Sequence, residues 1–180
     1  MWRNTPGSYG HVSIALHWLI ATTTFGLFAL GLWMVELDYY DGWYQRAPDI
    51  HKSTGMLLFA AALLRVLWRY SNPRPAPLGT TLEKHTAVLV HSGLDILLFI
   101  VMISGYLIST ADNRAIEVFS LFSVPATIAG LDNQADIAGA VHTWLAYALT
   151  GLAAVHAMAA LKHHYIDRDN TLRRMLGSRM

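Results

Sequence analysis

The chain has 180 residues, of which 54% are hydrophobic and only 14% carry a formal charge. This composition is typical of an integral membrane protein, and the net charge of +1 gives no reason to expect a nucleic-acid partner. The absence of cysteine excludes disulfides, thiolate-held iron–sulfur clusters and Cys-x-x-Cys-His haem attachment. Nine histidines remain as the strong nitrogen ligands.

Four charge-poor segments predict four transmembrane helices, and therefore an all-α membrane four-helix bundle. The first and last segments contain no Asp, Glu, Lys or Arg over 24 and 25 residues, enough for a helix to cross a bilayer. The total length suits one transmembrane domain, residues 1–180, rather than two domains. The predicted spans are residues 12–35, 51–70, 87–109 and 137–161.

Local signals mark the ends of these helices. Pro48 suits the first turn of the second helix, whereas the prolines between residues 71 and 79 require a non-helical connector. Thr80 and Glu83 fit a capping box that opens the third helix. Arg65 and Arg69 end the second span, where their long stems can reach the membrane surface.

The distribution of basic residues predicts the orientation. The N-terminus, the connector around residues 71–79 and the C-terminal tail hold ten of the 13 lysines and arginines. By the positive-inside rule, both termini are cytoplasmic. The ten are Arg3, Arg65, Arg69, Arg74, Lys84, Lys162, Arg168, Arg173, Arg174 and Arg179.

Two histidines share one face of the fourth span. His142 and His156 are 14 residues apart, which is four helical turns less about 40°, or about 21 Å along the axis. The fourth helix therefore offers one imidazole near each membrane surface. An imidazole at this depth indicates a functional site, because an unpartnered polar group in the membrane is costly.

Depth along the spans predicts two facing pairs of histidines. His17 and His156 both lie near the inner surface, whereas His51 and His142 lie about one turn into their spans from the outer surface. Two opposed imidazoles with a planar ring between them describe a six-coordinate haem, and two such sites describe a path for electrons. His91 also lies toward the inner side, on one face with Asp95, so depth alone leaves His17 and His91 as alternatives.

These positions resemble the bacterial cytochrome b561 family of di-haem membrane proteins. The resemblance rests on His17-Trp18, on His51, His142 and His156, and on the stretches 163–165 (His-His-Tyr) and 169–175 (Asp-Asn-Thr-Leu-Arg-Arg-Met). It implies that His17, His51, His142 and His156 are the axial ligands of two haems b. Asp95 departs from the apolar or aromatic residue that the resemblance leads us to expect.

The resemblance also implies a function. Stand-alone relatives of this size are quinone-linked electron carriers of the bacterial inner membrane, and some oxidise superoxide and reduce ubiquinone. We therefore expect an oxidoreductase that moves electrons from an outer donor, such as superoxide, to ubiquinone. One alternative is a haem-bearing subunit that receives electrons from a partner dehydrogenase or hydrogenase. Another, of a different class, is a metal transporter that uses its membrane histidines and Asp95.

Three further residues are candidates for the inner side. His163 follows His156 by seven residues, or two turns on the same face, and Arg65 ends the second helix at a similar level. Each of the two is a candidate to bind a quinone oxygen or a haem propionate. For Arg65 the reason is that a guanidinium favours anions. His91 with Asp95 offers a second polar face that can relay protons.

Overall fold

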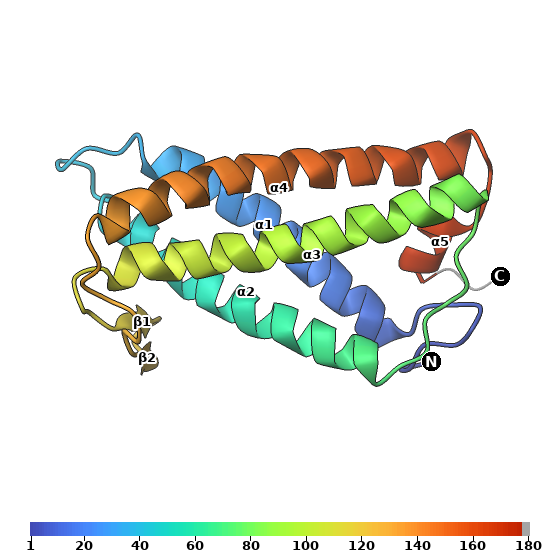
Figure 1. Ribbon diagram of the computed structural model, residues 1–180, viewed down its shortest axis with the longest axis horizontal. Helices are drawn as coiled ribbons and strands as arrows, with labels where there is room; N and C mark the ends of the chain where they lie inside the picture. The colour runs from blue at the N-terminus through green and yellow to red at the C-terminus, as the bar shows by residue number, and fades with distance from the viewer. Residues whose placement is uncertain (178–180) are drawn as a thin grey trace.

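The computed structural model describes residues 1–177 and contains four long helices, two short strands and a short C-terminal helix (Figure 1). All four long helices have the length and composition needed to cross a membrane, so the predicted four-helix membrane bundle is confirmed. They are α1 (His11–Met34), α2 (Arg46–Tyr70), α3 (Thr81–Thr110) and α4 (Gln134–Tyr165). The remaining elements are β1 (Ile116–Val118), β2 (Phe122–Val124) and α5 (Thr171–Met175).

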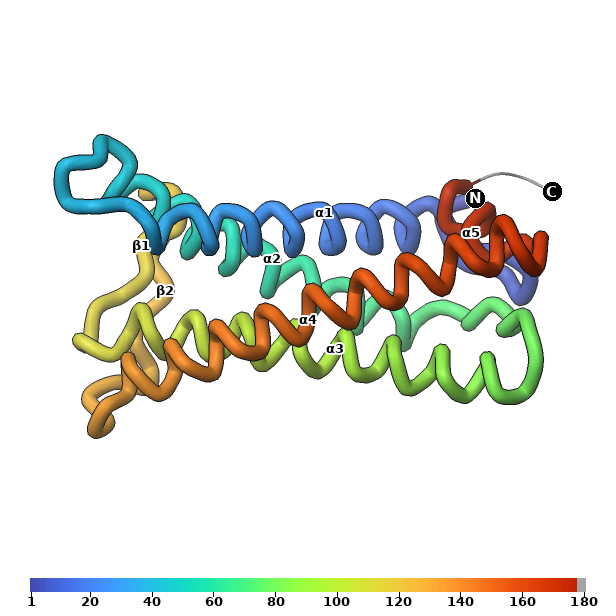
Figure 2. Tube along the Cα trace, turned by 90° about the horizontal axis from the view of Figure 1, so that it is seen from above, coloured from blue at the N-terminus to red at the C-terminus, as the bar shows by residue number. Residues whose placement is uncertain are grey.

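The helices form two antiparallel pairs, α1 with α2 and α3 with α4 (Figures 1 and 2). Both termini lie at one end of the bundle, together with α5 and the proline-rich connector, and the strands lie at the other end. The assignment of the first end to the cytoplasm remains a prediction from the basic residues. Arg179, one of those residues, lies outside the described part of the chain.

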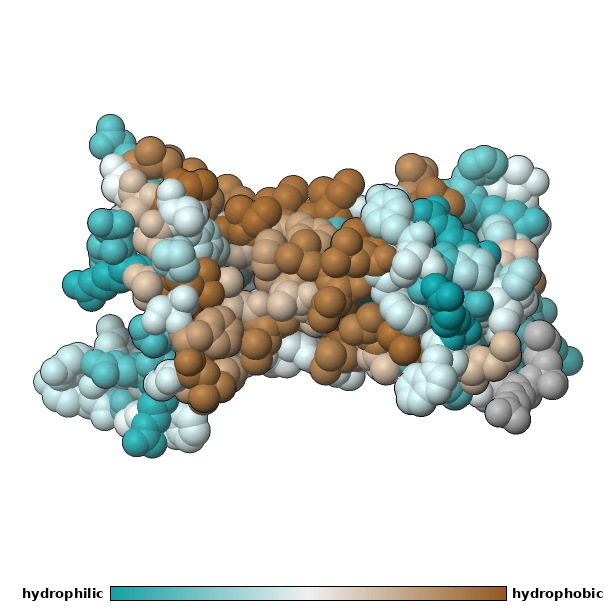
Figure 3. All heavy atoms as spheres, turned by 90° about the horizontal axis from the view of Figure 1, so that it is seen from below, coloured by the Kyte–Doolittle hydropathy of each residue, from teal (hydrophilic) through white to brown (hydrophobic). Residues whose placement is uncertain are grey.

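On the face drawn in Figure 3, apolar side chains cover the middle of the molecule and polar residues gather at both ends. Few side chains of the four helices are buried within the chain, and the exposed ones include many large aliphatic and aromatic groups. Such a surface is stable in lipid, where apolar side chains need no cover.

One buried layer holds the four helices together near the middle of the bundle. It takes two side chains from α2 and one from each of the other three long helices. Leu149 of α4 lies seven residues from both His142 and His156. The layer therefore separates the histidines into two levels, each about 10 Å from Leu149 along α4. Its members are Ile20, Leu58, Ala62, Leu98 and Leu149.

The end with both termini is closed by contacts between distant segments. The Thr80–Glu83 capping box is present as predicted, and Pro48 lies in the first turn of α2. The indole of Trp18 in α1 donates a hydrogen bond to the Met175 carbonyl of α5 at 2.8 Å. The tail thus returns to cover the start of α1.

Candidate functional site

Following the predicted orientation, we call the end of the bundle that carries the strands the outer end and the end that carries both termini the inner end. At the outer level, His51 and His142 lie face to face. Their ring centroids are 6.1 Å apart and their planes are inclined by 71°. His51 lies two turns before Leu58 of the buried layer, and His142 lies two turns before Leu149. The predicted partners therefore meet on one side of that layer.

The tautomer of His142 is fixed by the backbone of α3. Its Nδ1 lies 2.9 Å from the Val101 carbonyl oxygen and 3.3 Å from the Ser104 hydroxyl. Since a carbonyl can only accept a hydrogen bond, Nδ1 carries the proton and the lone pair is left on Nε2. A backbone carbonyl behind the second ring nitrogen is the arrangement found for metal-ligating histidines.

Glycines make room around both outer rings. A Cβ atom on Gly105 would lie 3.1 Å from Cε1 of His142, and one on Gly31 would lie 3.4 Å from Cε1 of His51. Gly55, one turn after His51, faces open space: apart from its chain neighbours and its own helix backbone, no described atom lies within 4 Å of the position of a Cβ. A close helix contact at Gly55 is thereby excluded for the described residues, and room for a flat ligand remains.

The inner level brings three histidine rings together. The centroids of His17 and His156 are 6.4 Å apart, with an inclination of 68°, and those of His91 and His156 are 5.0 Å apart. His17 and His156 are half-buried, whereas His91 is exposed on the surface of the bundle. His17 and His91, the two alternatives that depth leaves open, therefore both lie beside the ring of His156.

The spacing of the rings tests whether a metal fits between them. A first-row metal binds an imidazole nitrogen at about 2 Å, so two opposed nitrogens are about 4 Å apart and their ring centroids about 6 Å apart. The distances of 6.1 Å for His51–His142 and 6.4 Å for His17–His156 agree with this value. The 5.0 Å separation of His91 from His156 is too short. These residues fit two bis-imidazole haem sites, and the spacing favours His17 over His91.

A buried ring nitrogen without a hydrogen-bond partner gives a second test of whether a ligand fits at the outer level. Nδ1 of His51 is buried and has no hydrogen-bond partner among residues 1–177. A buried polar atom without a partner costs free energy, so a histidine at membrane depth indicates a functional role. Binding a ligand between the rings of His51 and His142 would be such a role.

Arg65 lies close enough to His17 and His156 to act on both electrostatically, and it forms an ion pair with Asp95 of α3. Arg69 donates to the other carboxylate oxygen of Asp95 at 3.0 Å. The sequence predicted that both arginines reach toward the surface, but it gave no sign of this three-residue cluster. Two cations against one anion leave a positive charge beside the inner histidines.

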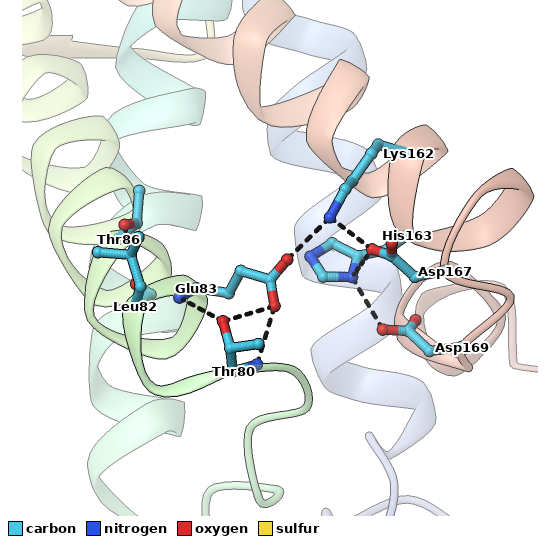
Figure 4. Close-up of polar contacts among 8 residues, drawn as sticks. All are labelled: Thr80, Leu82, Glu83, Thr86, Lys162, His163, Asp167 and Asp169. Carbon is cyan, nitrogen blue, oxygen red and sulfur yellow. Dashed lines mark hydrogen bonds and ion pairs between the residues drawn. The ribbon is translucent and has the colours of Figure 1, made fainter.

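His163 lies farther toward the termini, in a cluster of charged residues (Figure 4). Its Nδ1 is 2.8 Å from a carboxylate oxygen of Asp169 and 3.1 Å from one of Asp167. Arg65, His91 and His163 thus do not form one site. Arg65 and His91 lie beside the inner ring pair, and His163 belongs to a separate acidic cluster.

We predict that Gly105→Ala disturbs the outer site alone. The new Cβ atom would lie 3.1 Å from Cε1 of His142, which is tighter than ordinary contact, so the ring must shift and its hydrogen bond to the Val101 carbonyl is disturbed. The measurement is ligand content and the spectrum of each site in the purified variant. Gly26→Ala is the matched control, because a Cβ atom there meets no described atom within 4 Å. Equal spectra for the two variants would contradict the expected contact.

Comparison with known proteins identifies the relatives of this chain. The family model described as prokaryotic cytochrome b561 matches residues 8–178. The chain is 54% identical over 176 residues to cytochrome b561 homolog 2 of Escherichia coli (strain K12), covering 97% of this chain and 94% of the relative. It is 30% identical over 176 residues to the "probable superoxide oxidase CybB" of Yersinia pestis, covering 93% and 95%. The predicted family resemblance is confirmed.

Proposed function

The chain belongs to the prokaryotic cytochrome b561 family, and from this premise we propose that it holds two haems b and passes electrons between them across the membrane. The family binds b-type haem and transfers electrons through it. The observation that carries the proposal is the pair of ring separations, 6.1 Å and 6.4 Å, on two levels of one bundle. His51 and His142 would hold the outer haem, and His17 and His156 the inner one.

The chain's own residues prepare the two sites. The Val101 carbonyl orients His142, and Gly31 and Gly105 keep both outer rings free of steric conflict. The buried layer between the levels excludes water from the middle of the bundle. Arg65 offers a positive charge for a propionate of the inner group or for a quinone oxygen. When bound, each haem supplies reversible one-electron chemistry at its iron.

The donor that we propose is superoxide at the outer end, and the acceptor is ubiquinone at the inner end. The balanced reaction is two superoxide anions plus one quinone and two protons, giving two molecules of oxygen and one quinol. The relative at 30% identity that is named a probable superoxide oxidase supports this choice of donor. The inner end supplies Arg65, His91 and His163 as polar groups for the quinone side of the reaction.

An absorption spectrum and a haem count of the purified protein test the cofactors directly. We expect a Soret band and two haems per chain, followed by quinone reduction when superoxide is generated outside proteoliposomes. Haems that are reduced only by a co-purifying dehydrogenase would favour the partner-subunit function. A colourless protein with bound zinc or iron would support the metal-transporter alternative. Membership in the cytochrome b561 family does not favour that alternative.

If superoxide is the donor, charge at the outer end will control its rate. That end carries eight acidic residues against three basic ones, and Lys52, beside His51, is paired with Asp49 at 2.9 Å. We expect Lys52→Glu to slow haem reduction by superoxide about tenfold at low salt, and Asp49→Asn to accelerate it by freeing the ammonium.

Stopped-flow rates across a range of ionic strength provide the measurement. Salt should raise the rate of Lys52→Glu, because it screens the repulsion between the anion and the acidic surface. Reduction by a neutral chemical donor serves as the control and should remain the same in both variants. Superoxide rates that ignore both substitutions would argue for another donor.

A further inference from the structure

A chain of charged groups connects α3, α4 and the segment before α5 at the end that carries the termini (Figure 4). The ammonium of Lys162 donates to Glu83 at 2.8 Å and lies 2.7 Å from Asp167. Asp167 lies 3.1 Å from His163, which lies 2.8 Å from Asp169. Five titratable side chains from three segments are therefore linked without a gap longer than a hydrogen bond or ion pair.

Four of these five groups, all except Lys162, line a cavity of about 380 Å³ that opens to solvent. Since a water molecule occupies about 30 Å³ in the liquid, the cavity can hold several waters. All of the residues that line it are polar or glycine. The lining residues are Gly79, Thr80, Glu83, His163, Asp167 and Asp169.

Exposure falls along the cluster toward the histidine. The Lys162 side chain is 45% exposed and that of Asp167 30%, whereas that of His163 is only 17% exposed. His163 follows His156 by seven residues on α4, about 10 Å nearer the end of the bundle. The cluster thus runs from solvent toward the inner ring pair.

The protonation pattern of His163 follows from its neighbours. Burial raises the pKa of Asp169, but hydrogen bonds from the backbone and side chain of Thr171 and from His163 outweigh it, and the pKa is lowered overall. An ionised carboxylate can only accept a hydrogen bond, so Nδ1 of His163 carries a proton. Nε2 is then the nitrogen that can exchange a proton with water or substrate.

We propose that this cluster takes protons from the cytoplasm and delivers them through His163 to the quinone reduced at the inner end. The proposal rests on the function proposed above. Each quinone takes two electrons and two protons to become a quinol. His163, as an imidazolium, gives the proton on Nε2, keeps the one on Nδ1 against Asp169, and is reloaded at Nε2 from cavity water.

The charged groups around His163 predict the sign of a pH effect. Asp167 and Asp169 face it from the segment before α5, Glu83 faces the cavity from α3, and Lys162 lies between Glu83 and Asp167. Removing the Asp169 charge makes the imidazolium easier to deprotonate. The pH profile of quinone reduction by Asp169→Asn should then move about one unit to lower pH.

The experiment follows quinone reduction by pre-reduced protein in liposomes from pH 5 to 9. Asp169→Asn should slow the reaction about tenfold at pH 8, recover at pH 6, and retain haem content and reduction by the donor. Asp167→Asn should shift the profile in the same direction by less, because Asp167 is more exposed than Asp169 and lies farther from Nδ1 of His163, at 3.1 Å against 2.8 Å. Asp112→Asn, at the opposite end, is the matched control.

The outcomes separate the two proposals. Unshifted profiles in both Asp169→Asn and Asp167→Asn would overturn the proton route while leaving electron transfer intact. Loss of haem without a shift would assign the cluster a structural role and would likewise overturn it. Wild-type protein whose reduced haems pass no electron to quinone would overturn the proposed function, and the proton route with it.

Discussion

Replacing His51 or His142 with alanine is expected to remove one haem, and replacing His17 or His156 is expected to remove the other. Each haem would be held by two imidazoles from two different helices. Loss of either ligand therefore removes the haem at that level and leaves the other haem in place. The haem-to-protein ratio should fall from about two to about one, with about half of the Soret absorbance retained.

Redox titration of the variants distinguishes local loss from general misfolding. The haem that remains should keep its wild-type midpoint potential, because the buried layer around Leu149 separates the two levels. His85→Ala is the control, since this exposed residue bonds only the Thr81 carbonyl of its own helix among the contacts described. A ratio near two in all four ligand variants would refute the assignment. If His91→Ala loses a haem and His17→Ala does not, α3 supplies the inner ligand.

The four spans were predictable because charge is costly in lipid, so long runs without charge leave few alternatives to helices. The pairing of His51 with His142 was predictable from depth alone, since the helices are antiparallel and the distance of each imidazole from the membrane surface can be counted along the chain. The choice between His17 and His91 was not, because it depends on the rotation of α1 and α3. The family resemblance implied His17, and the ring separations of 6.4 Å for His17 and 5.0 Å for His91 also favour it.

The hairpin of β1 and β2 was missed for a local reason. Its turn residues, Phe119 and Ser120, both adopt left-handed conformations, with φ of 48° and 58°. Tight hairpin turns of this kind usually contain Asn or Gly, so the sequence carries no turn signal here. The conformation is held by Ser53 of α2, whose hydroxyl donates to the Glu117 carbonyl and accepts from the amide of Phe119.

The acidic cluster around His163 was missed because it depends on the course of a turn. Arg168 has a φ of 53°, an unusual conformation for a residue with a side chain, and it lies between the two aspartates that reach His163. Spacing placed His163 on the face of His156, but no periodic pattern predicts where a chain leads after its helix ends.

The Asp95 cluster leads to the second prediction with a large effect. Asp95 binds both Arg65 and Arg69 across α2 and α3, and all three side chains lie in the inner half of the bundle. Asp95→Asn removes the anion and leaves two guanidiniums that repel each other in a poorly hydrated site. The cluster is only partly buried, with side-chain exposures of 22% for Asp95 and 27% for Arg65, so losing its anion should cost about 2 kcal/mol, less than in a fully buried pair. The variant should therefore unfold at lower temperature.

The same substitution should change the inner haem and spare the outer one. A unit charge at about 10 Å acts with about 1.7 kcal/mol at an effective dielectric constant of about 20. Since about 59 mV corresponds to a tenfold change, or about 1.4 kcal/mol, for a one-electron couple, the loss of the anion should raise the inner midpoint potential by about 70 mV. Removing negative charge favours the reduced state, which fixes the sign.

Redox titration of Asp95→Asn resolves both haems in one sample, so the outer haem is its own control. A triple replacement of Arg65, Arg69 and Asp95 by leucine should recover stability, because apolar packing can replace an ion-pair cluster at little cost. It should not restore the wild-type inner potential, since the two cations are also gone. An inner potential that stays constant in Asp95→Asn would mean that the cluster fastens α2 to α3 without acting on the inner site.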